Sequence, residues 1–455
     1  MGRFFSSVLA VVSCCAVGTP GCGGSEFSAA ETEGAGGSSS GGTSSSGGTS
    51  SGGAAGSAAG GNGNGGASTG GTGALGSGGN GAVSGNAGAP GGSGGSVSCP
   101  EPSGDELWVD GKASAGGNGS QACPFRTIPE GIAALGSTSA TTVLVQSGSK
   151  YAGGFTVPSG YTVRASDPQT ELKGTTMCDS GSVCAVVVSA NARLENFTIL
   201  LEDNEDGVLL GMDSTLRQVK TRGGRRGIVV NGQAVLELGV EATDSVHSGI
   251  EVVAGGTLGF PNGDYKFTGS QGVGLRVLGN AVIDMSHLTE QAAVDFSDSA
   301  EGIRFESRSD AVTASTPASE IRFARFQRNQ VSLTVRNNVK VNVRNSEFLG
   351  AVNPAVQLFA PNFANFGDNS NVGGNVFQRA DGGSSVAFMM LCDQPFSNTP
   401  KIALAGNTFP NCPSIGYAGR LQVGSCPTTA SGADTIAFFP GGTIPGEAAF
   451  NGSCL

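Results

Sequence analysis

The chain has 455 residues, enough for two or three domains by length alone, and a formal net charge of −11. Such an acidic chain is a poor match for nucleic acid as a partner, because binding to phosphate needs a basic surface. It contains 78 glycines and few aromatic residues. This composition suits a tightly coiled β structure better than a helical enzyme.

The first residues have the pattern of a secretion signal. Arg3 is followed by an apolar run over residues 4–12, which is too short to span a bilayer as a helix. Residues 1–22 resemble a bacterial lipoprotein signal, in which a cysteine after small residues is lipidated. We expect lipidation at Cys22, or at Cys14, with a plain cleaved signal peptide as the alternative. The resemblance implies export and a lipid anchor at the outer membrane, exposed on the cell surface.

A long stretch of small residues separates this signal from the rest of the chain. Residues 34–98 are almost entirely Gly, Ser, Ala, Thr and Asn, without a charged residue. They cannot bury enough apolar surface to offset the entropy lost on ordering, so we expect a disordered tether over 23–98. A coil of this kind has a mean end-to-end distance of roughly 40–50 Å, and it would hold the domain over 99–455 away from a membrane.

The folded domain opens with a recognisable order of segments. A strand with the sequence Leu-Trp-Val-Asp is expected over 107–110 and is followed by a loop rich in small residues. Thr127 and Glu130 form a capping-box pattern, which predicts a short helix over 128–135. Further strands are expected over 142–145 and 151–157, and Val143, Val145, Gly148 and Tyr151 follow one another at short spacing across them.

This order resembles the opening of secreted bacterial proteins of the pectin-lyase-like superfamily. The similarity covers residues 107–157 well and extends loosely to about residue 410. It implies an all-β fold, a right-handed single-stranded parallel β-helix whose N-terminal helix covers the first coil. It implies little about function, because the superfamily holds lyases, hydrolases, adhesins and members of unknown role.

A short pattern recurs over residues 207–285. Four glycines, each opening an apolar strand, recur at spacings of 20, 22 and 23 residues: Gly207, Gly227, Gly249 and Gly272. A second apolar strip follows them at Leu216, Val235, Leu258 and Val282. Repeats this short cannot bury their apolar side alone, so they must stack as a solenoid. We expect about ten to twelve coils in the domain.

The predicted domain contains an even number of cysteines. They are Cys99, Cys123, Cys178, Cys184, Cys392, Cys412, Cys426 and Cys454. An even number in an oxidising compartment indicates disulfides, although eight cysteines allow about 105 connectivities. We expect local pairs, 99 with 123, 178 with 184, 392 with 412 and 426 with 454, which would fasten both ends of the solenoid.

Charged residues recur at matching positions before three of the repeat glycines. They are Glu202, Glu205 and Asp206, then Arg222, Arg225 and Arg226, then Asp244 and His247. Because equivalent positions of stacked coils lie in adjacent rungs, we expect these side chains to meet. The candidate catalytic residues are Asp206, Arg225, Arg226 and His247, and the candidate metal ligands are Glu202, Asp203, Glu205 and Asp206.

Two chemistries and one structural role fit this group. A carboxylate cluster suits Ca²⁺, and similarity to pectate lyases would make an arginine the base that removes a proton from a uronate. Similarity to polygalacturonases would instead give Asp206 and His247 a part in hydrolysis, although the chain lacks that family's Asp-Asp, Gly-His-Gly and Arg-x-Lys motifs. The competing interpretation is a ladder of surface ion pairs, each worth about 0–1 kcal/mol.

A basic run lies further along the chain. Between residues 321 and 344 there are six cations and no acidic residue: Arg322, Arg325, Arg328, Arg336, Lys340 and Arg344. On one flat β face they would form a strip able to bind an acidic polysaccharide. The competing interpretation is a solvated face whose charge is balanced by acids on neighbouring coils.

These patterns favour a monomeric surface lipoprotein whose β-helix binds, or presents a face to, extracellular polysaccharide or a neighbouring cell without catalysis. The alternative is a polysaccharide lyase or hydrolase that acts on uronate-containing polymers. We expect no cofactor other than a calcium ion, and no nucleic acid partner.

Overall fold

The computed structural model describes most of the predicted domain. The described residues are 98–179, 182–310, 312–352, 354–360, 363–367, 370–378, 388–392, 401–402, 406–408, 420–422 and 437–438. They all belong to one compact unit, Gly92–Leu455. The predicted signal, the lipidation candidates Cys14 and Cys22, and nearly all of the predicted tether lie outside these residues. No helix among the described residues is long and apolar enough to cross a membrane.

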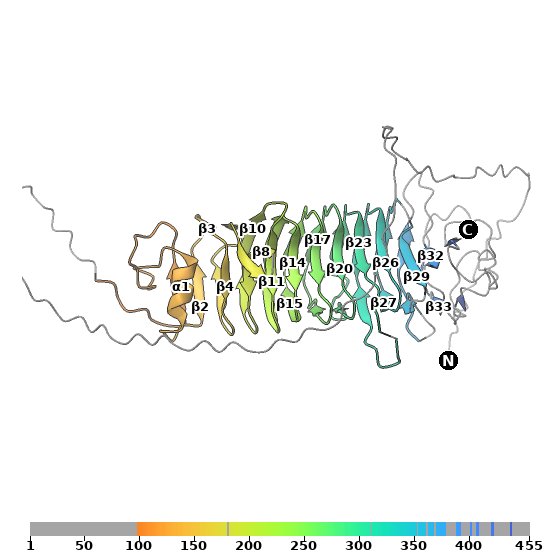
Figure 1. The fold of residues 1–455 in the computed structure, drawn as a ribbon, viewed down its shortest axis with the longest axis horizontal. Coiled ribbons are helices and arrows are strands. Elements are labelled where there is room, and N and C mark those ends of the chain that lie inside the picture. Colours follow the sequence, from red (N-terminus) through yellow and green to blue (C-terminus); the bar gives the residue numbers. More distant parts are fainter. Residues whose placement is uncertain are drawn as a thin grey trace, which may run out of the picture. The chain divides into compact units, whose positions relative to one another are not determined.

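The chain winds into a right-handed parallel β-helix, which confirms the predicted fold. Figure 1 shows its strands stacked as successive rungs, with the helix α1 at the N-terminal end of the stack. Within the described residues three long sheets run along the stack, and almost all of their strands pair in parallel.

Each sheet collects one strand from every coil. Sheet 1 contains β1 (Glu106–Val109), β2 (Thr142–Val145), β5 (Thr162–Ala165), β9 (Arg193–Glu195), β12 (Ser214–Arg217), β15 (Gln233–Glu237), β18 (Thr257–Gly259), β21 (Val282–Asp284), β24 (Ser319–Arg322), β27 (Lys340–Arg344) and β30 (Phe363–Asn365). Sheet 2 contains β3 (Lys150–Ala152), β6 (Thr170–Lys173), β10 (Phe197–Leu201), β13 (Lys220–Gly223), β16 (Val240–Thr243), β19 (Tyr265–Thr268), β22 (Val294–Ser297), β25 (Ala324–Gln327), β28 (Glu347–Leu349) and β31 (Val376–Gln378).

Sheet 3 carries the predicted charged group. It contains β4 (Phe155–Val157), β8 (Ser182–Val188), β11 (Asp206–Leu210), β14 (Arg226–Val230), β17 (Ser248–Val252), β20 (Val273–Val277), β23 (Glu301–Phe305), β26 (Val331–Val335), β29 (Val356–Ala360), β32 (Phe388–Cys392) and β34 (Arg420–Gln422). The strand β7 (Thr176–Asp179) pairs with β8 as an antiparallel hairpin. A separate pair joins β33 (Lys401–Ile402) to β35 (Ala437–Phe438).

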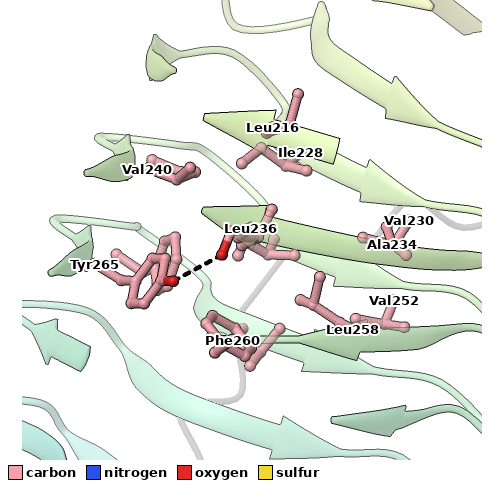
Figure 2. Packing of buried hydrophobic residues seen from close by; sticks show 14 of the residues in the cluster. Leu216, Ile228, Val230, Ala234, Leu236, Val240, Val252, Leu258, Phe260 and Tyr265 are labelled. Carbon is pink, nitrogen blue, oxygen red and sulfur yellow. Dashed lines mark hydrogen bonds between the residues drawn. The ribbon is translucent and has the colours of Figure 1, made fainter. Parts of the chain in front are cut away.

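The interior consists of apolar side chains stacked on their own kind. One row contains Val208, Ile228, Ile250 and Leu275. On sheet 1, Leu216 stacks on Leu236, and Ala234, Leu258 and Ile283 stack in register one beside the other; all of these side chains are buried. Figure 2 shows part of this interior, where the hydroxyl of Tyr265 donates a hydrogen bond of 2.7 Å to the carbonyl oxygen of Leu236. A run of phenylalanine rings continues the core on sheet 2, with centroids 4.6–5.5 Å apart from Phe267 through Phe296, Phe326 and Phe348 to Phe377.

Two details of the predicted repeat are wrong. The glycine stacked on Gly249 is Gly274 and not Gly272, because the connections before β18 and β19 are longer than those before β15 and β16. A Cβ added to Gly249 would lie 2.7 Å from the carbonyl oxygen of Gly274, so this close stack requires glycine. On sheet 1 the buried side chains are Leu236 and Ile283, not the adjacent Val235 and Val282, because a one-residue shift turns a strand side chain to the opposite face.

The N-terminal end of the stack is closed as expected. The helix α1 spans Ile128–Leu135, with the capping box between Thr127 and Glu130 formed as predicted. Residues 119–125 pair with the open edge of β1: the amide of Trp108 donates to the carbonyl of Gly119 at 2.8 Å, and the amide of Phe125 donates to the carbonyl of Trp108 at 2.8 Å. This cover protects an edge strand that would otherwise pair with another chain.

The cysteine pairing is confirmed at one place and wrong at another. Cys99 and Cys123 form the expected disulfide, which fastens the N-terminal cover. Cys178 is a free thiol, so the expected bridge from Cys178 to Cys184 is not formed. The β7–β8 hairpin places Thr176 opposite Cys184, and Cys178 lies at an irregularity in its register. The side chain of Cys392 and the residues Cys412, Cys426 and Cys454 lie outside the described part of the chain.

Candidate functional site

The predicted charged residues meet on the outer side of sheet 3. Asp206 at the start of β11 is in register with Arg226 at the start of β14. Arg225 directly precedes β14, and His247 directly precedes β17 on the next coil, where its amide donates to the carbonyl of Arg225. We call the outward group that begins here the acid–arginine column. Its members are Asp206, Arg225, Arg226, His247, Glu251, Arg276, Glu301, Arg304, Glu306 and Arg336.

Asp206 is held by two guanidinium groups at once. Arg225 donates from Nε to Oδ1 at 3.0 Å and from Nη2 to Oδ2 at 2.6 Å, and Arg226 makes the same pair of hydrogen bonds at the same distances. The carboxylate is only 2% exposed. Burial alone would raise the pKa of Asp206, but the hydrogen bonds from Arg226 and Arg225 outweigh it and lower that pKa below its ordinary value.

Glu251 continues the column on the next coil. It is 4% exposed and accepts hydrogen bonds from Nη1 of Arg226 and, at 3.2 Å, from Nη1 of Arg276. Arg226 therefore bridges two buried carboxylates. The hydrogen bond to Asp206 is the main cause that raises the pKa of Arg226, against the opposing effect of burial, and Glu251 adds to the rise.

His247 lies beside Glu251 and is much more exposed than that carboxylate. Its Nδ1 is 3.8 Å from a carboxylate oxygen of Glu251, and its Nε2 is 3.4 Å from Nη1 of Arg276. Burial and the charge of Arg276 lower the pKa of His247, while Glu251 acts in the opposite direction. The imidazole is therefore mainly neutral at pH 7.

The column extends beyond the residues that the sequence pattern indicated. Arg276 donates to Glu306 at 3.0 Å, Arg304 pairs with Glu301 and Glu306, and Arg336 lies 3.4 Å from Glu306 and 4.7 Å from the ring centre of Phe359. Glu251, Arg276 and Arg304 occupy one register position on successive strands, the position held by Leu209 and Val229 on the coils before them. Strict alternation along each strand would have indicated them.

This geometry is poor for the chemistry that the resemblance implies. A base must be able to accept a proton, but the arginine with the most contacts has a raised pKa and the carboxylate beside it a lowered one. Asp206 and Arg226 line a pocket of about 310 Å³, but the acid and base groups there are paired with each other. The column is the ladder of ion pairs given above as the competing interpretation.

The candidate calcium ligands do not assemble. The described residues contain no group of three or more His, Cys, Asp or Glu side chains placed to hold one metal ion. Glu205 accepts hydrogen bonds from the hydroxyl of Thr175 and the amide of Glu202, while Asp206 is occupied by the two arginines. Glu202 and Asp203 are exposed. These residues therefore do not fit a calcium ion.

The predicted basic strip is spread around the coil. Arg325 pairs with Glu347 at 2.9 Å on sheet 2, Arg328 pairs with Asp298 at 2.7 Å, and Arg336 belongs to the acid–arginine column. On sheet 1, Arg322 and Arg344 are in register, and Arg322, Lys340 and Arg344 all donate to carbonyl oxygens. The expectation of one flat strip is wrong, because residues 321–344 run almost once around the coil and therefore face different sides.

Sheet 2 shows the same compensation of charge in a simpler form. Its outer row alternates in sign over most coils, with Lys150 next to Glu171, Lys220 next to Glu241, Lys266 next to Asp295 and Arg325 next to Glu347. Three of these register pairs are ion pairs at 2.8–2.9 Å. Neighbouring coils thus supply opposite charges, which avoids the repulsion of like charges stacked in register.

The chain is similar to solved structures, but it matches no protein family. No family model matches the chain, and no curated protein matches it. Among solved structures, the chain is similar to the A-module of mannuronan C-5 epimerase AlgE4 from Azotobacter vinelandii, with 15% identity and a TM-score of 0.43 over 74% of this chain and 100% of that one. The A-module of AlgE6 from the same organism has 15% identity and a TM-score of 0.41 over 69% and 94% of the two chains. An alginate lyase from Paenibacillus sp. str. FPU-7 has 13% identity and a TM-score of 0.33 over 65% and 95%.

Proposed function

We propose that this protein is a lipid-anchored cell-surface protein whose β-helix binds, or presents a face to, extracellular polysaccharide or a neighbouring cell without catalysing a reaction. The observation that carries the non-catalytic part is the pairing of Asp206 with both Arg225 and Arg226. Three of the four candidate catalytic groups, Asp206, Arg225 and Arg226, are already partners of one another and are not free for a substrate. The fourth, His247, lies beside Glu251 and Arg276.

The repeating surface supports a linear polymer as partner. Equivalent side chains recur on successive coils along the stack, about 4.7–4.9 Å apart, which is close to the length of one sugar unit. Solenoids offer extended surfaces of this kind, and an elongated ligand can contact several coils in turn. The outer rows are polar and carry hydroxyl, amide and charged groups able to bond sugar hydroxyls.

The full-length chain should be mixed with neutral, amino-sugar and uronate polysaccharides and separated by size. We expect it to co-elute with at least one polymer whose length does not change. Shortening of any polymer would show an enzyme and overturn the non-catalytic proposal. Absence of co-elution across the panel and of binding to intact cells would overturn the binding proposal.

The anchor is tested separately by labelling cells with a radioactive fatty acid. We expect the label on the full-length chain, its loss in Cys22→Ala and its retention in Cys15→Ala. Loss in Cys14→Ala alone would move the lipidated position to the other candidate. Absence of label from the unaltered chain would contradict the lipid anchor.

A further inference from the structure

The first coil carries a basin on its outer side that contains the chain's single tryptophan. Along β1, Leu107 and Val109 are fully buried in the core, so Trp108 between them faces outward, where it is partly exposed. The basin has a volume of about 880 Å³. That lies within the range of about 300–1,000 Å³ typical of small-ligand pockets.

The walls of this basin are fastened to each other. One wall is formed by residues 100–106 and the other by residues 120–122, and the disulfide between Cys99 and Cys123 joins the two segments. The side-chain amide of Asn118 also donates to the carbonyl oxygen of Pro100 at 2.7 Å. A site whose walls are fixed before binding loses less conformational entropy when a ligand enters.

The polar groups of the basin are acidic and largely unpaired. Glu101 and Asp105 are exposed, and no hydrogen bond or ion pair joins their carboxylates to the described residues. Glu106 is paired with Arg164 at 2.5 Å, and Gln121 adds an amide. Among the described residues, no Lys or Arg lines the basin. These groups can accept hydrogen bonds from hydroxyl or ammonium groups, and they repel an anion.

We propose that this basin binds a sugar unit that carries no acid group, a neutral hexose or an amino sugar. The apolar face of a pyranose packs against the ring of Trp108, and its hydroxyl groups donate to the carboxylates of Glu101 and Asp105. An ammonium group on the sugar would add a cation–π contact with the same ring. The inference rests on the proposed function. It names a different ligand, a sugar without an acid group, whereas the basic run over 321–344 predicted an acidic polysaccharide.

The single tryptophan provides a direct probe. Trp108 fluorescence of the full-length chain is followed while neutral, amino-sugar and uronate hexasaccharides are added. We expect a saturable change with at least one sugar of the first two classes and none with the uronate. A change with the uronate of equal size, or no change with any sugar, would overturn the proposal.

Variants tested by calorimetry separate binding from folding. Trp108→Ala should weaken binding about tenfold or more, as expected for an aromatic anchor, and Trp108→Phe should weaken it less. If Trp108→Ala does not fold, Glu101→Gln with Asp105→Asn leaves the ring in place and should still weaken binding severalfold. Phe363→Ala, which removes a 46% exposed aromatic ring of the distant strand β30, is the matched control and should bind as the unaltered chain.

Failure of this inference is distinct from failure of the proposed function. If a polymer co-elutes with the chain but binds Trp108→Ala and the carboxylate variant with unchanged affinity, the basin is not the site and the proposed function stands. If nothing co-elutes, the proposed function fails by itself.

Discussion

The acid–arginine column and the Trp108 basin both contain carboxylates, but those of the column are paired with arginines and two of those in the basin are not. In the column each carboxylate has a coil on both sides, and Asp206 and Glu251 find guanidinium partners there. At the basin no coil of the described chain precedes β1, and the carboxylates of Glu101 and Asp105 have no partner among the described residues. In a stacked repeat, pairing between coils neutralises the charges of inner coils. At the first coil, carboxylates without a cationic partner among the described residues remain able to bind a ligand.

The largest effect is expected from breaking the column at its most buried acid. Asp206→Ala leaves two guanidinium groups without their shared partner, and loss of one member of a buried ion pair typically destabilises by about 3–5 kcal/mol. Because Arg225 is partly exposed, we expect about 3 kcal/mol, measured as the free energy of unfolding in denaturant. A change below about 1 kcal/mol would mean that the column is an ordinary surface network.

Opening the N-terminal cover should have a smaller and more local effect. The disulfide between Cys99 and Cys123 closes a loop with a sequence separation of 24 residues, and a bridge of this kind contributes about 2–3 kcal/mol. Replacing both cysteines by serine should expose the amides of 107–109 to hydrogen exchange and weaken sugar binding. The amides of β14 should keep their protection; equal loss in both regions would contradict a local role.

The pH dependence of the unfolding free energy tests whether ionised Asp206 stabilises the fold. Its folded pKa lies below the ordinary value of 3.8, so its contribution is complete above that value and is lost as the pH falls through the folded pKa. The difference in unfolding free energy between the unaltered chain and Asp206→Asn should be constant from pH 5 upward and shrink below about 3.8. A difference that stays constant down to about pH 2 would show that Asp206 is not the titrating group.

The smallest effect is expected at an exposed pair of the same type. Arg328 and Asp298 form two hydrogen bonds of 2.7 Å, but their side chains are 64% and 47% exposed. Asp298→Ala should change the free energy of unfolding by about 0–1 kcal/mol. It is the matched control for Asp206→Ala, and equal losses in both variants would show that burial does not govern the column.

The sequence alone predicted the coiled fold, the helix that caps it and the first residues of the acid–arginine column. The capping box at Thr127 and Glu130, the stacking of the first three repeat glycines and the meeting of Asp206 with the two arginines follow from local pattern and spacing. The later coils could not be predicted in the same way, because the number of residues per coil varies. It grows from 20 residues between Val208 and Ile228 to 30 residues between Ile303 and Leu333, so an extrapolated period loses register.

The errors share one physical origin, which is that a coil turns the chain through every direction. A run of cations over 321–344 looked like one strip and is distributed over three sheets. Cys178 and Cys184 are near in sequence, but the hairpin register places Thr176 and not Cys178 opposite Cys184. The basin was missed because its walls at 100–106 and 120–122 meet only in the fold, although an outward tryptophan on the first strand was a readable signal.

The central claim is that charges in the column satisfy one another and that recognition takes place at the first coil. The most direct test is to titrate one hexasaccharide that binds the full-length chain into Arg225→Ala and Trp108→Ala by calorimetry. The account predicts that Arg225→Ala binds as the unaltered chain and that Trp108→Ala binds about tenfold more weakly. The reverse order, with affinity lost in Arg225→Ala and kept in Trp108→Ala, would contradict it.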